Sequence, residues 1–354
     1  MTSLATGLAS DDPEAAPADL GRGRGPAGGQ VVGHLPGRLE ELRRELTGYC
    51  YRMLASTFDA EDAVQDTMIR AWRSLDRFDG RSTLRTWVYR IATNVCLDML
   101  AGRRRRALPI DLGPASVPVE RSLGQPLPEA TWVEPIPDVR VLPESTDPAE
   151  LAIARESIRL AFVIALQHLP PRQRAVLILR DVLRWKADEV AELLDTTVAS
   201  ANSALQRART TMAAKHGSAL VLDPMDDVQR ALLGRYVDAF ERYDIESLVS
   251  LLHEDATQTM PPYDLWLRGP ADIARWLAGP GSGCEGSVLV PVEASGLQGY
   301  GQYRPSGPGG RHEPFAIHVV EVSGGRIAQL THFIEPKLFA VFGLPDRIEP
   351  RGDR

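Results

Sequence analysis

Apolar residues recur at helical spacing through residues 38–106. One face of a predicted helix carries, at intervals of four, three and four residues, Val64, Met68, Ala71 and Leu75. This spacing is typical of a helix that buries one side. Ile69 lies on the opposite, polar side, so it is either an incidental exposed side chain or a contact for a partner protein.

A second helix is predicted after a loop at residues 78–82, with Ser82 as its N-cap, and the pattern indicates that it continues to the arginine run at residues 103–106. Its buried face carries Leu84, Val88, Ile91 and Val95, and its other faces carry Arg85, Trp87, Tyr89, Arg90, Thr93 and Asn94. Aromatics stack on unpaired bases and arginines hold phosphates, although isolated aromatics are more often packing residues. The arginine run suits a phosphate backbone, but a solvated charge run is the plainer interpretation.

The segments on either side complete the N-terminal half. An amphipathic pattern from Leu39 to Leu54 makes residues 38–106 a three-helix unit. Residues 1–37 contain much Ala, Gly, Pro and Asp without a sustained period, which predicts a disordered tail. Residues 107–148 contain nine prolines, which exclude a regular helix and favour a passive linker.

Residues 149–216 predict a further helical domain. One helix is expected at 148–167, and a restart follows the break at Pro170. Residues 187–194 and the pattern from Val198 onward then predict two helices joined by a tight turn, which is a helix-turn-helix. The inward face of the second helix carries Ala201, Leu205, Ala208 and Met212. Its outward face carries Ser200, Asn202, Ser203, Gln206, Arg207, Arg209 and Thr210. Forked Asn, Gln and Arg side chains match base edges, although any helical hairpin can imitate this pattern.

Residues 226–345 follow a different pattern. Helices are predicted at 228–243, 245–253 and 271–278, and strands at 256–260, 287–294, 298–304, 314–322 and 326–334. The turn Ser323-Gly324-Gly325 joins the last two strands as a hairpin. Helices followed by a curved antiparallel sheet describe an α+β cone. The expected fold class is therefore multidomain, with two all-α domains and one α+β domain.

Length, charge and cysteine content limit the classes of protein to which the chain can belong. The length of 354 residues allows two or three domains, and the net charge of −7 argues against DNA binding by bulk electrostatics alone. Cys50, Cys96 and Cys284 lie far apart and outside any metal-ligand spacing, which favours a reduced cytoplasm. The sequence contains no metal or phosphate-loop motif, so no cofactor is expected. It also contains neither a long apolar run nor a basic start followed by an apolar core, which predicts a protein that is neither membrane-spanning nor secreted.

The motifs AEDAVQDTMIRAW, FDGRST and TWVYRIATNVCLD resemble region two of the sigma-70 family, in its small extracytoplasmic-function class of bacterial transcription initiation factors. The resemblance implies that the first helix binds the clamp helices of the RNA polymerase β′ subunit. It implies that the loop captures a flipped base of the promoter minus-ten element and that the second helix helps to melt the duplex. The implied polymerase-binding residues are Asp62, Gln65, Asp66, Ile69 and Arg70. The implied DNA-binding residues are Gly80, Arg81, Ser82, Thr83, Trp87, Arg90, Asn94, Arg103 and Arg104.

The stretch LPPRQRAVLILRDVLRWKADEVAELLDTTVASANSALQRART resembles region four of the same family, which reads the minus-thirty-five element. The resemblance adds the polymerase β flap as a partner. Many family members have Gly at or beside Thr196, so the turn here rests on Asp195 and the threonines. The implied DNA-binding residues are Ser200, Asn202, Ser203, Gln206 and Arg207.

The motifs MPPYDLWLRGP, GYGQYRP and FGLP resemble a subgroup of these sigma factors with a SnoaL-like extension of the nuclear-transport-factor-two-like fold. In that fold the sheet wraps around a pocket, for which the candidates are Tyr263, Trp266, Tyr300, Tyr303, His318 and His332. Some members of the fold are isomerases or cyclases, and His253, Asp255 and His332 are conceivable acid–base groups. Such histidines are more often structural, so no catalytic residue is assigned.

The leading hypothesis is a cytoplasmic alternative sigma factor, not an enzyme, that binds core RNA polymerase and promoter DNA. Its C-terminal domain is expected to regulate it through an intramolecular contact, because tethering gives a high effective concentration. One alternative is an enzyme-like or metabolite-binding domain fused to DNA-binding helices, which specific ligand binding or turnover would favour. Another is a repressor that binds its operator without polymerase.

Overall fold

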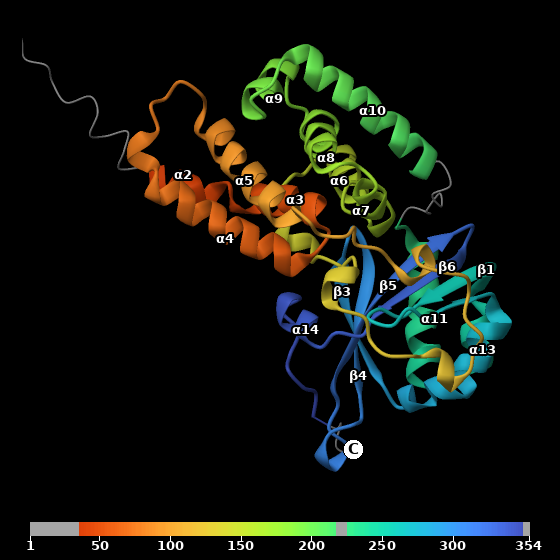
Figure 1. The fold of residues 1–354 in the computed structure, drawn as a ribbon. Helices are drawn as coiled ribbons and strands as arrows, with labels where there is room; N and C mark the ends of the chain where they lie inside the picture. Colours follow the sequence, from red (N-terminus) through yellow and green to blue (C-terminus); the bar gives the residue numbers. More distant parts are fainter. Residues whose placement is uncertain (1–34, 217–224, 350–354) are drawn as a thin grey trace, which may run out of the picture.

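The computed structural model describes residues 35–216 and 225–349, which Figure 1 shows as two groups of helices above a sheet domain. The first helical unit consists of α2 (Leu35–Glu41), α3 (Arg43–Leu54), α4 (Thr57–Arg73) and α5 (Leu84–Leu100). The helix predicted from residue 39 to 54 is thus interrupted at Leu42. The predicted tail at residues 1–37 lies almost entirely outside the described residues.

The caps and faces of α4 and α5 follow from their sequences. The Ser56 hydroxyl accepts from the Asp59 amide at 3.1 Å and begins α4. The Thr83 hydroxyl accepts from the Thr86 amide at 3.0 Å and begins α5, so the prediction that Ser82 is the cap was wrong by one residue. The predicted inner faces are confirmed as buried or half-buried, and the residues involved are Val64, Met68, Ala71, Leu75, Leu84, Val88, Ile91 and Val95.

The linker, residues 107–147, is buried at residues 107–109 and 132–138 and mostly exposed between them. Its only regular elements in the described chain are the 3-10 turns η2 (Pro109–Asp111), η3 (Glu120–Ser122), η4 (Glu129–Thr131) and η5 (Asp138–Arg140), as its prolines predict. Trp132, Val133 and Ile136 are buried, and the Leu127 amide donates to the Pro262 carbonyl at 2.8 Å. Parts of this segment therefore pack between the helical units and the sheet domain, which a freely solvated linker would not do.

The second helical unit consists of α6 (Pro148–Glu156), α7 (Leu160–Gln167), α8 (Pro171–Leu177), a π-helical turn (Ile178–Val182), α9 (Ala187–Leu193) and α10 (Val198–His216). The single helix predicted at residues 148–167 is broken. Arg52 of α3 donates to the Ser157 carbonyl at 3.1 Å and to its hydroxyl at 2.6 Å. Because a continuous helix needs that carbonyl for its own ladder, the arginine stabilises the break.

The C-terminal domain, residues 225–349, contains α11 (Asp227–Glu241), α12 (Ile245–Ser250), α13 (Pro270–Ala278) and α14 (Lys337–Val341). Its strands are β1 (Leu252–Thr259), β2 (Trp266–Arg268), β3 (Val288–Ala294), β4 (Leu297–Arg304), β5 (Glu313–Ser323) and β6 (Arg326–Phe333). They pair in the order β2-β1-β6-β5-β4-β3. The prediction of a purely antiparallel sheet was wrong, since β1 runs parallel to β6. The sequence pattern predicted neither β2 nor α14.

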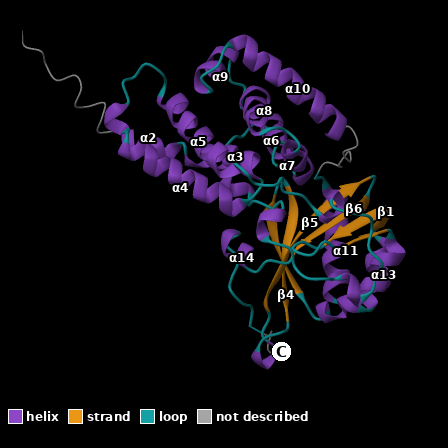
Figure 2. Ribbon diagram, viewed as in Figure 1, coloured by secondary structure: helices purple, strands orange, loops and turns teal. Residues whose placement is uncertain are grey.

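Figure 2 shows the strands below the helical units, with α11 and α13 beside the sheet. Buried apolar side chains form two clusters on opposite faces of this curved sheet. The inner cluster joins α11, α12 and α13 to one face. The outer cluster is continuous through both helical units, the linker, α14 and the other face, which supplies Ile317, Val319 and Phe333. The sheet domain is thus built into the same core as the helices. Within residues 35–216 and 225–349, no helix combines the length and apolarity needed to cross a bilayer.

Candidate nucleic-acid and polymerase interfaces

The α9–α10 pair has the geometry of a helix-turn-helix. Asp195 adopts a left-handed conformation with φ of 50°, which Asp tolerates better than most residues, and so takes the place that glycine often occupies in such a turn. The Thr197 hydroxyl then accepts from the Ser200 amide at 3.1 Å and begins α10. This capped turn orients α10 with its polar face outward.

The outer face of α10 is exposed in the described part of the chain. All the predicted DNA-reading residues are exposed, namely Ser200, Asn202, Ser203, Gln206 and Arg207. The guanidinium of Arg209, at the margin of this face, is held by two hydrogen bonds to Asp181, at 2.9 and 2.7 Å. Arg207 makes no ion pair with any described residue. Arg207 is therefore available to bind a ligand, whereas Arg209 is already bound to Asp181.

The loop before α5 forms a second exposed polar site. Gly80 has φ of 72°, a conformation that favours glycine, and the Arg81 amide donates to the Asp79 carboxylate at 3.1 Å. Trp87 packs against Phe78 with ring centroids 5.3 Å apart and stays half-buried. One ring of this pair could stack on a base without unfolding the helix. Exposed or half-buried beside it lie Gly80, Arg81, Ser82 and Thr83.

The middle of α5 is covered by the second helical unit. The Arg90 guanidinium donates to the Glu192 carbonyl of α9 at 3.0 Å. The Arg85 guanidinium lies 4.7 Å from the Trp185 ring centroid, and the buried Tyr89 ring packs against the same tryptophan at 4.9 Å. Of the side chains expected on the DNA face of α5, Arg85, Tyr89 and Arg90 are thus engaged inside the protein, whereas Asn94 is exposed.

The arginine run does not extend α5. The helix ends at Leu100, about 25 Å along its axis from its first turn, so Arg103 and Arg104 lie far from the loop at residues 80–83. Arg103 pairs with Asp59 at 2.7 Å, and Arg106 is buried on the same carboxylate, also at 2.7 Å. The prediction that the helix continues to the arginines was therefore wrong, and part of the run is structural. Arg104 is exposed.

The outward face of α4 presents a mixed apolar and charged surface. All the predicted polymerase contacts are exposed, and they are Asp62, Gln65, Asp66, Ile69 and Arg70. Ile69 is 40% exposed, and Trp72, three residues later, is 61% exposed. An exposed tryptophan beside an exposed isoleucine is typical of a protein-binding surface. Trp72 was not among the predicted contacts, although its place one helical turn after Ile69 puts it on the same face.

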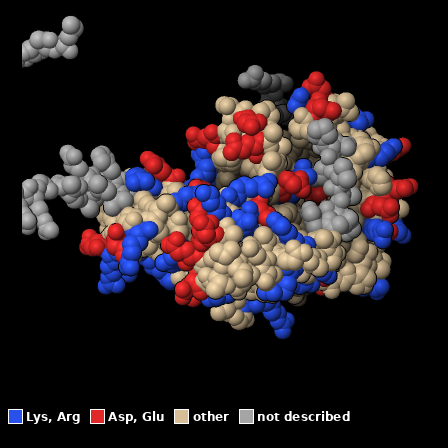
Figure 3. All heavy atoms as spheres, turned by 90° about the horizontal axis from the view of Figure 1, so that it is seen from above, with Lys and Arg blue, Asp and Glu red and all other residues tan. Residues whose placement is uncertain are grey.

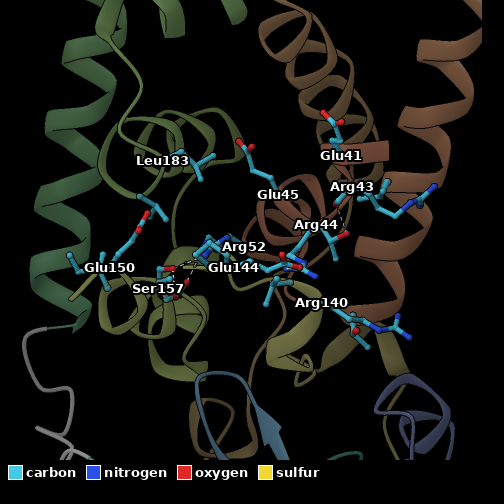
Figure 4. A pocket seen from close by; sticks show the side chains of 18 of the residues that line it. Glu41, Arg43, Arg44, Glu45, Arg52, Arg140, Glu144, Glu150, Ser157 and Leu183 are labelled. Atoms are coloured by element: carbon cyan, nitrogen blue, oxygen red, sulfur yellow. Dashed lines mark hydrogen bonds and ion pairs between the residues drawn. The ribbon is translucent and has the colours of Figure 1, made fainter. Parts of the chain in front are cut away.

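Charges on the helical end are mixed. Figure 3 shows basic side chains gathered near the middle of this face with acidic groups around them. A cleft of about 1220 Å³ opens between α3, α6 and the end of the linker, as Figure 4 shows. A smaller apolar groove of about 710 Å³ lies between α6 and α10, with Ile153, Phe162 and Met212 in its lining.

Two buried arginines cross between the helical units in opposite directions. Arg52 reaches from α3 to Ser157, as described above, and Arg174 reaches from α8 to the carbonyl of Met53. Arg174 also donates to the Leu166 carbonyl at 2.9 Å and the Gln167 side-chain oxygen at 2.7 Å. Burial lowers the pKa of each guanidinium to about 10, so both stay charged at neutral pH. Their carbonyl partners make this interface specific in its geometry.

The inner face of the sheet contains a polar network around two stacked histidines. The rings of His318 and His332 lie 4.0 Å apart. His318 contacts the Gln302 side-chain oxygen at 2.9 Å and the Tyr236 hydroxyl at 3.0 Å. Because that oxygen can only accept, Nε2 of His318 carries the proton and Nδ1 accepts from Tyr236. Burial lowers the pKa of both histidines, to about 4 for His332, so both rings are neutral.

The remaining pocket candidates do not all join this network. Tyr300 is buried on the inner face and Tyr263 is half-buried at its edge. Trp266 instead donates from Nε1 to the Gly113 carbonyl of the linker at 2.9 Å. Tyr303 packs on Phe339 of α14 in the outer cluster. The prediction of one pocket for all six residues therefore fails for these two, because neighbouring residues of a strand face opposite sides.

The conceivable acid–base groups outside the network lie at the surface. Asp255 is exposed and pairs with Arg268 at 3.1 Å. His253 lies in β1, not in the helix predicted for it, and its Nδ1 accepts from the Asp255 amide at 3.1 Å. His332 has a buried Nε2 with no hydrogen-bond partner among the described residues. The three groups therefore do not meet at one reaction centre.

Three family models match the chain in the order of these units. Sigma-70 region 2 matches residues 39–106, Sigma-70, region 4 matches residues 159–212, and the SnoaL-like domain matches residues 233–330.

Two curated relatives align over most of the chain. The ECF RNA polymerase sigma factor SigG of Mycobacterium tuberculosis is 43% identical over 335 residues, which cover 92% of this chain and 88% of that protein. The ECF RNA polymerase sigma factor SigJ of the same species is 30% identical over 331 residues, covering 88% and 96%. The crystal structure of Mycobacterium tuberculosis SigJ matches with a TM-score of 0.54 and 25% identity, over 87% of this chain and 99% of that one.

Proposed function

Because the chain belongs to the extracytoplasmic-function sigma factors, it binds core RNA polymerase and directs initiation at promoters, and we propose which of its surfaces do so. The observation that carries this assignment is the exposed polar face of α10, held outward by the capped turn at Asp195. We assign minus-thirty-five recognition to it, through Ser200, Asn202, Ser203, Gln206 and Arg207.

The minus-ten element is assigned to the first helical unit. Residues 80–83, Trp87 and Asn94 form the exposed site for the melted strand, with Arg104 as a phosphate contact. Arg90 and Arg103 belong to this surface only after they leave Glu192 and Asp59. Promoter opening therefore requires the second helical unit to move away from α5.

The polymerase surfaces are assigned in the same way. The outward face of α4, with Ile69 and Trp72 at its apolar centre, is the contact for the β′ clamp helices. The apolar groove between α6 and α10 is the contact for the β flap, because its lining suits an apolar helix from a partner. A cytoplasmic location follows from these two partners.

The C-terminal domain is assigned a regulatory role in cis and no catalysis. The curated relatives that align over most of the chain are RNA polymerase sigma factors. The hydrogen bonds of His318 are satisfied by Tyr236 and Gln302, which favours a structural histidine over a general base. A ligand-binding role remains the second candidate, and the buried, unpartnered Nε2 of His332 favours it. A specific metabolite that raises the melting temperature of the full chain but not of a His332→Phe variant would support it.

In vitro transcription tests the proposed function. The full chain and core polymerase are incubated with genomic promoter fragments, and core polymerase alone is the matched control. We expect transcripts with defined starts that require the chain. Absence of binding to core polymerase by folded protein would contradict the assignment, and DNA binding without polymerase would revive the repressor alternative.

A further inference from the structure

The first turn of α10 exposes an apolar side chain beside the polar residues assigned to the minus-thirty-five element. Val198 is 43% exposed and joins neither of the two apolar clusters formed by the described residues. It takes no part in the cap either, because the hydroxyl that begins α10 belongs to Thr197. A branched side chain lowers helix propensity, so alanine would serve the helix better at this position. Single exposed valines are common on protein surfaces, and what distinguishes Val198 is its position on the helix.

Val198 begins a row of side chains along α10. Residues four apart are neighbours on a helix surface, so Val198, Asn202 and Gln206 form one ridge. Asn202 and Gln206 are exposed. At about 1.5 Å per residue the ridge is about 12 Å long, which corresponds to about three to four base steps of duplex DNA. One apolar side chain is thus aligned with two amides over the length of a short DNA element.

The chemistry of this ridge matches adenine–thymine pairs. In the major groove adenine presents a donor and an acceptor side by side, which the amide of Asn or Gln binds together. Thymine presents its 5-methyl group in the same groove, and an apolar side chain is the complement of that group. The N-terminal residues of a recognition helix are the ones that contact base edges, and Val198 and Asn202 both lie there.

The charge of α10 also suits contact with DNA. Its 19 residues include no Asp or Glu, although the whole chain has more acidic than basic residues, 47 against 40. An acidic residue in the first turn would stabilise the helix through its dipole but would repel phosphates. The seven residues of α9 include Asp188, Glu189 and Glu192, so the lack of acidic residues is not a property of the whole helix-turn-helix.

The polymerase surface assigned to α10 lies toward its other end. The apolar groove against α6 includes Met212 and Ala213 in its lining. Met212 lies about 21 Å from Val198 along the helix axis. A partner held in that groove is therefore centred far from Val198, whereas Ser200 and Asn202 of the DNA face adjoin it.

We propose that Val198 is a specificity-determining residue that reads the 5-methyl group of a thymine in the minus-thirty-five element, as part of a ridge that selects adenine–thymine pairs. The proposal rests on the assignment of α10 to that element and adds the bases that it selects. Asn202 lies about 6 Å from Val198 along the helix. The thymine read by Val198 and the adenine read by Asn202 therefore lie within about two base pairs of each other.

Removal of single methyl groups from the promoter tests the role of Val198. Thymines of the minus-thirty-five element are replaced one at a time by deoxyuridine, which lacks only the 5-methyl group, and promoter binding by holoenzyme containing the full chain is measured. Loss of one buried methyl group should weaken binding about fourfold at one position. Val198→Ala should weaken binding to the thymine promoter to a similar extent and should no longer distinguish thymine from deoxyuridine there. Val198→Ile keeps the apolar contact and should keep the distinction.

Val228→Ala is the matched control, because it makes the same chemical change at an exposed valine of α11. It should keep full sensitivity to the methyl group. Promoter-specific binding in which no thymine is sensitive, or in which Val198→Ala stays sensitive, would overturn the role of Val198 and leave the proposed function intact. Weaker binding of Val198→Ala to core polymerase would overturn it as well. Absence of promoter-specific binding by the unmodified holoenzyme would instead overturn the proposed function and the ridge together.

Replacement of adenines by 7-deazaadenine, which lacks the N7 acceptor, locates the contact of Asn202 in the same way. The adenine that Asn202→Ala no longer distinguishes from 7-deazaadenine should lie within about two base pairs of the methyl-sensitive thymine. A separation of about five base pairs or more would overturn the ridge, because the two side chains could not then read the same stretch of the groove.

Discussion

Arg207 is the unengaged arginine on the outer face of α10, and its predicted role is recognition of a base. If it forms two hydrogen bonds to a guanine, Arg207→Ala should reduce discrimination within the minus-thirty-five element by about 1–3 kcal/mol. Holoenzyme binding to promoter variants substituted one base at a time measures this. An equal loss on every promoter sequence would instead make Arg207 a phosphate contact.

Arg209 provides the matched control on the same helix. Its guanidinium is bound to Asp181, so Arg209→Ala removes a similar side chain without removing a free recognition group. We expect its base discrimination to stay at the level of the unmodified chain.

Glu134 makes stability depend on pH. Burial raises the pKa of its carboxyl to about 7, although the hydrogen bond from Ser56 and the charge of Arg106 oppose this. Between pH 4.5 and 7 the unfolded chain ionises Glu134 while the folded chain keeps it neutral. Raising the pH through this window therefore lowers the free energy of unfolding. Above pH 7 the loss is complete.

Glu134→Gln should remove this part of the pH dependence. Gln can still accept from Ser56 but cannot ionise, so the variant should gain stability relative to the unmodified chain by about 2–4 kcal/mol between pH 4.5 and 8. Denaturant unfolding at the two pH values measures the difference. The neighbouring charges of Asp59, Arg106 and Glu129 are present in both proteins and cancel. A constant difference across the window would mean that Glu134 is already ionised in the fold.

At the scale of elements, α4 carries the clearest test of a partner surface. Trp72→Ala should weaken binding to core polymerase by about 10–30-fold, because exposed tryptophans that a partner buries are common hot spots. Val228 of α11 is 71% exposed, and Val228→Ala serves as the control for loss of an exposed apolar side chain. Equal affinity for both variants would remove Trp72 from the interface.

The buried faces of the helices were predictable because they depend on local periodicity. The residues at which helices end were not predictable, because they depend on contacts with distant parts of the chain. The inner faces of α4, α5 and α10 follow from the spacing of their apolar residues. The breaks at Leu42 and Ser157 do not, and the second depends on Arg52, which is 105 residues away in the chain. The exposure of Ser200, Asn202 and Gln206 was likewise predictable, because the inner stripe of α10 leaves them outside.

At the scale of the whole molecule, the types and order of the units were predictable and their packing was not. Proline content predicted that the linker has no α-helix but not that Ile136 pairs with Ser295, 159 residues later. The contact between Arg90 and Glu192 likewise joins two helices, and nothing in their sequences indicates that they pack together. The prediction of the pocket listed aromatic residues without assigning each to a face of the sheet. Because side chains alternate between the two faces of a strand, Tyr303 and Trp266 lie apart from the inner network.

The continuous outer core also has a consequence for timing during synthesis. The helical units are complete when His216 has been made, but Phe333 and Phe339, which close the outer core, come more than a hundred residues later. At about 5–20 residues per second, translation of that interval takes roughly 6–25 s. Each new chain therefore passes through a period in which α5 and α10 exist without the sheet that completes the outer core. A ribosome stalled in this interval would present promoter-reading helices before the domain proposed to regulate them has been made.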